Sequence, residues 1–89
     1  MSDLNEGPLS LLKECVETHT KVIIDIGGKE GKKLIAKVIS FDEHFNMVLC
    51  DVLEEWTEKR GRVLEHKERY ISKMFLPGHN VRVIVKLTN

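Results

Sequence analysis

The chain has 89 residues, enough for one small domain and too few for two. Hydrophobic residues make up 42% of it and charged residues 31%, a balance that is typical of a globular domain and excludes global disorder. The formal net charge is zero, so the sum gives no reason to expect a nucleic-acid partner. The charges are segregated, however: residues 21–37 are mainly basic, residues 42–58 mainly acidic, and residues 59–69 mainly basic. Such a pattern produces either a local basic surface or only solvated strand faces and loops.

The cysteines and the hydropathy indicate the compartment. Cys15 and Cys50 are the only two cysteines and lie far apart in the sequence, which favours a reducing compartment over a disulfide scaffold. The polar N-terminus predicts no signal peptide, and no apolar run approaches the roughly 20 residues of a membrane-spanning helix. We therefore expect a soluble intracellular protein with no membrane partner and with a flexible N-terminus over residues 1–6.

Residues 8–18 are predicted to form a short amphipathic helix. Pro8 suits the first helical position, because the missing N–H of proline would have no partner there. Four apolar residues recur at helical spacing and form one stripe: Leu9, Leu12, Cys15 and Val16. Residues 18–20 lower the helix propensity, so the helix is expected to end near them.

From residue 21 onward the apolar period changes to two, which is typical of β-strands. Five strands are predicted, at residues 21–26, 33–42, 47–56, 69–76 and 81–87. The charged segment 57–66 lacks periodicity and is predicted to be a long hairpin loop, whereas residues 77–80 are predicted to form a tight turn. The predicted fold class is mainly β. One domain over residues 1–89 has an N-terminal α-helix followed by a strongly bent five-stranded antiparallel sheet, which forms a small, partly open barrel over residues 21–87.

The last two predicted strands point to assembly with other chains. Residues 70–76 and 81–87 are rich in β-branched and aromatic residues, and an open five-stranded sheet leaves two edges without partners. Such edges pair with strands of neighbouring subunits. The alternative is a barrel closed on itself, in which the same residues belong to the core.

Two segments resemble the two motifs of the Sm protein family, and the resemblance covers nearly the whole chain. Residues 32–49 are similar to the first motif, with its aspartate, its aromatic residue or histidine, and its asparagine before an apolar strand. Residues 70–81 are similar to the second motif, in which an isoleucine precedes an arginine–glycine turn and the final strand. The segments that resemble the D-two branch of this family in particular are residues 7–10, 46–49, 56–58 and 69–76.

The resemblance implies the SH3-like Sm fold and a function. In that fold a helix caps a bent five-stranded barrel, and the fourth strand of one subunit pairs with the fifth strand of the next in a seven-membered ring. The implied role is in the core of small nuclear ribonucleoproteins for pre-mRNA splicing, where the ring binds uridine-rich single-stranded RNA. The implied neighbours are D-one-type and F-type Sm proteins, the implied location is nucleus and cytoplasm, and no cofactor is implied.

The resemblance also implies the residues that bind RNA. His44 stands at the stacking position of the family, and a flat imidazole can lie against a base. Asn46 stands where the family uses an amide, whose donor and acceptor can both face a uracil edge. Gly78 would allow the backbone to approach the base. Asp42 is expected to orient the loop rather than touch RNA, because a carboxylate near phosphate is repelled. Without the family, these residues indicate only an exposed histidine and two turn formers.

Two positions depart from the family pattern. Pro77 replaces the arginine of the second motif, so a charged contact to RNA is missing, and Ala36 replaces a glycine that eases strand bending. We therefore expect this subunit to hold its nucleotide more weakly than its neighbours do.

Three other functions are alternatives to this role. An enzyme is disfavoured, because no nucleophile elbow and no phosphate-binding glycine motif is present. Cys15 and His19 have the spacing of two metal ligands on a helix, yet no second pair completes a tetrahedral site, so no metal is expected. A subunit of an RNA-decay or self-assembling Sm-like ring, or a structural ring subunit with little RNA contact, would share the fold.

Overall fold

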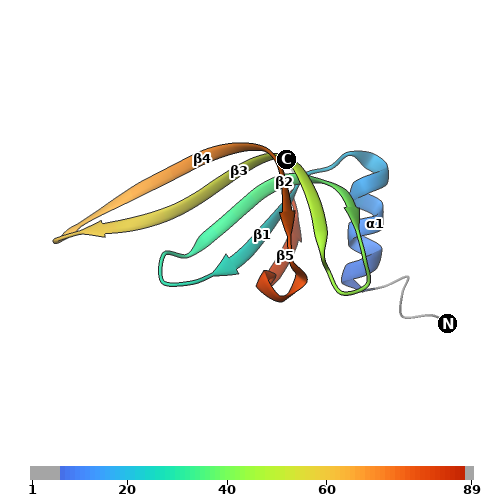
Figure 1. Ribbon diagram of the computed structural model, residues 1–89, viewed down its shortest axis with the longest axis horizontal. Coiled ribbons are helices and arrows are strands. Elements are labelled where there is room, and N and C mark those ends of the chain that lie inside the picture. Colours follow the sequence, from blue (N-terminus) through green and yellow to red (C-terminus); the bar gives the residue numbers. More distant parts are fainter. Residues whose placement is uncertain (1–6, 88–89) are drawn as a thin grey trace.

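The computed structural model describes residues 7–87, and it consists of one helix followed by five strands (Figure 1). The predicted flexible segment, residues 1–6, lies outside the described residues. The elements in chain order are α1 (Pro8–Thr18), β1 (Val22–Gly27), β2 (Lys32–Phe41), β3 (Met47–Arg60), β4 (Val63–Leu76), a 3₁₀ turn (Gly78–Asn80) and β5 (Val83–Lys86). The predicted fold class, an N-terminal helix followed by a bent antiparallel sheet of five strands, is confirmed.

The C-terminus of helix α1 is capped by backbone hydrogen bonds rather than by a charged side chain. His19 adopts the left-handed conformation with φ of 56°, and the N–H of Thr20 donates to the carbonyl of Cys15 at 3.0 Å. This arrangement satisfies carbonyls that a helix end would otherwise leave free. An ion pair of 3.0 Å between Lys86 and Glu14 joins the helix to β5.

The strands form one sheet in the order β4-β3-β2-β1-β5, and its bend comes from irregularities in the ladder. The register between β2 and β3 shifts twice, between Ile35 and Lys37 and between Val38 and Ser40. Asp51 has a positive φ of 51°, and the alternation of β3 changes there. Val52 is consequently buried together with Leu49, although strict alternation would place these two side chains on opposite faces.

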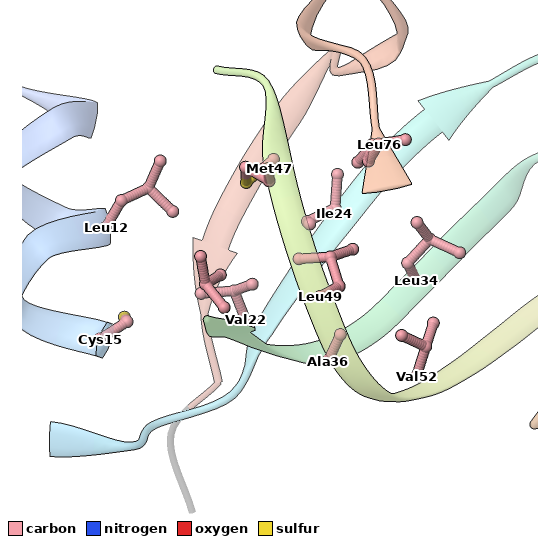
Figure 2. Packing of buried hydrophobic residues seen from close by; sticks show 11 residues of the cluster. Leu12, Cys15, Val22, Ile24, Leu34, Ala36, Met47, Leu49, Val52 and Leu76 are labelled. Atoms are coloured by element: carbon pink, nitrogen blue, oxygen red, sulfur yellow. The ribbon is translucent and has the colours of Figure 1, made fainter. Parts of the chain in front are cut away.

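The core lies inside the bend, between the sheet and the helix. Figure 2 shows Leu12 and Cys15 pointing from the helix toward side chains of the strands. Each fully buried aliphatic side chain of this kind contributes about 1.5–3 kcal/mol to the free energy of unfolding. The buried hydrophobic residues are Leu12, Cys15, Val22, Ile24, Leu34, Ala36, Val38, Met47, Leu49, Val52 and Leu76.

The expectation of a long loop at residues 57–66 is wrong. β3 and β4 continue as a regular ladder to the pair Arg60↔Val63, and only Gly61 and Arg62 form the turn. Gly61 has a φ of 60°, which two-residue hairpin turns need. The ladder is held by backbone hydrogen bonds and by ion pairs such as Arg60–Glu65 at 3.4 Å. The side chains of segment 57–66 are mostly charged or polar, and its large apolar residues, Val63 and Leu64, are adjacent and exposed, so it has no apolar period by which a strand could be recognised.

The sheet does not close on itself. β4 and β5 lie at opposite ends of the strand order, and each is paired along one side only in the part of the chain that the structure describes. Apolar side chains on these edge strands are exposed, including Tyr70 at 76%, Phe75 at 61% and Val85 at 51%. The open form of the predicted barrel is therefore the one observed, and two strand edges remain available for pairing.

A buried carboxylate anchors the base of the projecting β3–β4 hairpin. Glu54 is 5% exposed and lies 2.8 Å from Arg69 of β4 and 3.3 Å from Lys32 of β2. Among the described residues, Oε1 of Glu54 accepts no well-aligned hydrogen bond. The negative charge of the carboxylate is therefore balanced by the cations Arg69 and Lys32. Lys32 also lies 5.4 Å from the ring centroid of Trp56, which extends the network along β3.

Replacing Glu54 by glutamine should lower the free energy of unfolding by about 2 kcal/mol, because both cations would lose their partner at a buried position. Urea denaturation of the full chain measures this effect. Glu43→Gln removes the same charge from an exposed side chain and should change the value by less than about 0.5 kcal/mol. Equal effects of the two substitutions would show that the buried network does not stabilise the fold.

Candidate nucleic-acid interface

Two connections meet at one end of the sheet: the 42–46 loop, between β2 and β3, and the 77–80 turn, between β4 and β5. The 42–46 loop is organised by Asp42. One carboxylate oxygen accepts the backbone N–H groups of His44 at 2.8 Å and of Asn46 at 3.1 Å. The other accepts the side-chain amide of Asn46 at 2.9 Å. Asp42 thus orients the loop, as the sequence predicts.

Asn46 joins the two connections. Its side-chain oxygen accepts the backbone N–H of Gly78 at 2.7 Å, while its amide nitrogen donates to Asp42. The predicted role of Asn46 assigned both polar groups to a base, whereas in this structure each group already has one protein partner. One N–H and one lone pair of the amide remain for a ligand.

Gly78 lies against the backbone of the 42–46 loop. A Cβ atom at this position would overlap the carbonyl oxygen of His44 and approach the carbonyl carbons of His44 and Phe45 to 2.9 and 3.0 Å. Only glycine therefore permits this contact between the two connections. The sequence predicts close backbone approach at Gly78, and the structure identifies the neighbouring loop as the partner.

His44 projects into solvent from the 42–46 loop. Its side chain is 75% exposed, and its Nε2 lies 3.5 Å from a carboxylate oxygen of Glu43. The main chain of His44 is fixed by Asp42, so the ring extends from a rigid turn. An exposed aromatic ring on a fixed backbone is suited to stacking against a flat ligand.

Phe45 is a residue of this site that the sequence reasoning did not single out. It has a φ of 64°, a conformation that is costly for a bulky side chain and that hairpin loops of this length usually give to glycine. Its half-buried side chain packs against the core and offsets that cost. A large apolar residue at the expected glycine position of a hairpin is the sequence signal that could have revealed it.

Potential metal ligands gather elsewhere in the described part of the chain. Atoms of Glu55, His66 and Glu68 lie within 4.8 Å of one another on the β3–β4 hairpin, outside the two connections. Cys15 is buried in the core, where desolvation raises the pKa of its thiol, so it does not form a ligand pair with His19. Among the described residues no helix is long and apolar enough to cross a membrane.

The Gly78→Ala substitution should lower the free energy of unfolding by more than about 2 kcal/mol, because the added methyl group collides with backbone that is itself held by Asp42. Gly61→Ala is the matched control. It shares the cost of a positive φ but meets nothing within 4 Å, so about 1 kcal/mol is expected. If both variants lose the same amount in urea denaturation, the tight contact between the connections does not exist in solution.

The hydrogen bond from the Asn46 side chain, together with two backbone N–H groups, lowers the pKa of Asp42 below its ordinary value of 3.8. A carboxylate with a lowered pKa stabilises the folded state at pH values above the ordinary range, and this contribution is lost as the pH falls through the lowered pKa. NMR titration of the Asp42 carboxyl should show the lowered value in the wild type and a return toward 3.8 in Asn46→Ala. Identical titration curves in the two proteins would contradict the bridging role of Asn46.

Sequence comparison identifies relatives along almost the whole chain. The LSM domain model matches residues 11–86. The small nuclear ribonucleoprotein Sm D2 of Saccharomyces cerevisiae is 45% identical over 84 residues, which cover 94% of this chain and 74% of the relative. Sm D2 of Schizosaccharomyces pombe is 42% identical over 92 residues, which cover 96% and 77%. The probable Sm D2 of Caenorhabditis elegans is 43% identical over 91 residues, which cover 94% and 75%.

Solved structures agree on the fold. A heptameric archaeal Sm protein superposes with a TM-score of 0.65 at 19% identity, covering 89% of this chain and 98% of that one. The Sm protein of Pyrococcus abyssii, solved in complex with a uridine heptamer, has a TM-score of 0.65 at 24% identity, covering 92% and 100%. These identities show a shared fold alone, whereas the matched domain and the Sm D2 relatives show descent. The chain therefore belongs to the LSM domain family, within which its relatives are Sm proteins of the D2 type.

Proposed function

We propose that this chain is the Sm D2-type subunit of a seven-membered Sm ring that binds uridine-rich single-stranded RNA in small nuclear ribonucleoproteins and so serves pre-mRNA splicing. The observation that carries the proposal is the joined pair of connections, in which Asn46 bonds both Asp42 and Gly78 and the side chain of His44 is exposed. Relatives at 42–45% identity carry the name of a ribonucleoprotein subunit, and a structural neighbour was solved with a uridine heptamer.

The proposed assembly uses the two open edges of the sheet. Among residues 7–87, β5 pairs only with β1 and β4 only with β3, so within this range each presents one free row of backbone donors and acceptors. A neighbouring β4 added to this β5 would continue the ladder and would cover exposed side chains such as Val83 and Val85. The proposed neighbours are the D-one-type and F-type Sm proteins.

Within the ring, His44 is proposed to stack on a base, and the remaining donor and acceptor of Asn46 are proposed to meet its edge. A pyrimidine offers a flat face and a polar edge to such a pair, and single-stranded RNA leaves both accessible. Gly78 contributes by allowing the 77–80 turn to close on the 42–46 loop. Pro77 makes that turn more rigid but contributes no positive charge. This agrees with the expectation that the subunit binds its nucleotide weakly.

The relatives and the residues of the site disfavour the alternative functions. The D2-type relatives favour a spliceosomal ring over an RNA-decay ring, which would use the same fold. We propose no enzymatic activity, since the connections at the site hold no nucleophile with an adjacent base. We also propose that the protein resides in the nucleus within its ribonucleoprotein and in the cytoplasm before assembly.

The His44→Ala variant, reconstituted with its partner Sm proteins, should bind oligouridine at least about fivefold more weakly than the wild-type ring, because base stacking contributes roughly 1–3 kcal/mol. Fluorescence anisotropy measures the affinity, and native mass spectrometry verifies the ring. His66→Ala is the control, since it removes an exposed histidine from the β3–β4 hairpin instead. Unchanged affinity in an intact His44→Ala ring would identify a structural subunit with little RNA contact.

A further inference from the structure

The proposed RNA site has no strong cation of its own. The 42–46 loop contains two carboxylates, Asp42 and Glu43, and the 77–80 turn contains only His79 as a basic residue. RNA carries one negative charge per nucleotide, and positively charged side chains beside the strand normally supply most of the affinity. A base held by His44 and Asn46 therefore brings a phosphate close to two negative charges.

Arg82 is the cation that the fold places beside this site. A hollow of about 390 Å³ opens next to the two connections, and it is lined by Phe45, Gly78, Val81, Arg82, Val83 and Ile84. Phe45 belongs to the 42–46 loop and Gly78 to the 77–80 turn, so Arg82 lines the same hollow as one residue of each connection. Val81 and Ile84 belong to the apolar side of the hollow and pack against the core.

The main chain of Arg82 is bonded to β1, and its side chain lies across Gly27. Its backbone N–H donates to the carbonyl of Asp25 at 2.9 Å, which fixes the main chain against β1. The side chain then lies across Gly27, where a Cβ atom would come within 2.6 Å of Cδ and 2.7 Å of Nη1. Because Gly27 has no side chain, the side chain of Arg82 can occupy this space.

Arg82 forms no ion pair with the residues that the structure describes. Over residues 7–87 no carboxylate lies within ion-pair distance of its guanidinium, whereas Arg60 and Arg69 each have a glutamate partner at 3.4 and 2.8 Å. Arg82 is also exposed to solvent. An arginine that is held in place yet unpaired is available for an anionic ligand, and its planar fork suits the oxygens of a phosphate.

We propose that Arg82 binds the phosphate of the RNA nucleotide that occupies the His44–Asn46 site, and so supplies the charge that the two connections lack. This inference rests on the proposed function. Arg82 acts as a positioning residue for the RNA backbone, while His44 and Asn46 contact the base. The competing role is in assembly, since Val83 begins the open edge strand β5 and a neighbouring subunit could use the same arginine.

The test compares rings reconstituted from the full-length chain and its partner Sm proteins, carrying Arg82→Gln, Arg82→Lys or the control Arg62→Gln. Arg62 is an exposed arginine in the turn of the β3–β4 hairpin, so its substitution removes the same charge at another place. Oligouridine affinity is measured at several salt concentrations, and native mass spectrometry measures ring integrity.

Arg82→Gln should weaken oligouridine binding roughly fivefold and reduce the slope of log affinity against log salt by about 0.7, the loss of one phosphate contact to a single strand. Arg82→Lys should keep the salt slope, because the charge remains, and Arg62→Gln should match the wild type. An Arg82→Gln ring that binds like Arg62→Gln would overturn the inference. A ring that fails to assemble only with Arg82→Gln would also overturn it, since Arg82 would then serve the subunit contact.

The two proposals fail in distinguishable ways. If His44→Ala weakens binding while Arg82→Gln does not, the RNA site stands and only the phosphate contact is rejected. If neither substitution changes the affinity of an intact ring, both proposals are rejected.

Discussion

The open edges of the sheet are the constraint on which the rest of the protein depends. Register shifts bend the strands around a core of 11 buried hydrophobic residues, but the bend stops before β4 can pair with β5. A domain of this size gains little stability from its own core, and exposed strand edges carry backbone groups that only another strand can satisfy well. Tyr70, Phe75 and Val85 lie exposed on those edges. The two edges are therefore suited to pairing with strands of neighbouring subunits.

The bend also creates the candidate site. Residues 42–46 and 77–80 are separated by more than 30 positions in the sequence, yet Asn46 bonds Gly78 directly at 2.7 Å. Two features support this hydrogen bond. Asp42 accepts the side-chain amide of Asn46, and the lack of a side chain at Gly78 allows the two backbones to come into contact. A site fixed before its ligand arrives loses less conformational entropy on binding than a flexible loop would. The strained backbone of Phe45, held by core contacts, belongs to the same preorganisation.

The secondary-structure elements and the residues of the site could largely be predicted from the sequence, because they depend on the spacing of apolar residues and on short motifs. The apolar stripe of α1 and the period of two in the strands indicated the elements and their order, and the family motifs indicated which residues share the site. The hairpin at residues 57–66 was missed, since its mostly polar side chains show no apolar period and its strands are held by backbone bonds and ion pairs. The bulge at Asp51, the partners of Asn46 and the place of Arg82 beside the two connections could not be predicted either, because they depend on backbone angles and on contacts between distant residues.

Native mass spectrometry of the full chain, alone and mixed with a D1-type Sm protein, tests most directly whether the open edges require different neighbouring chains. A stable one-to-one complex is expected, with the lone chain monomeric or aggregating, because its β4 and β5 edges are then completed only by a different subunit. A discrete closed ring formed by this chain alone would contradict its assignment as an Sm D2-type subunit and would identify a self-assembling Sm-like protein.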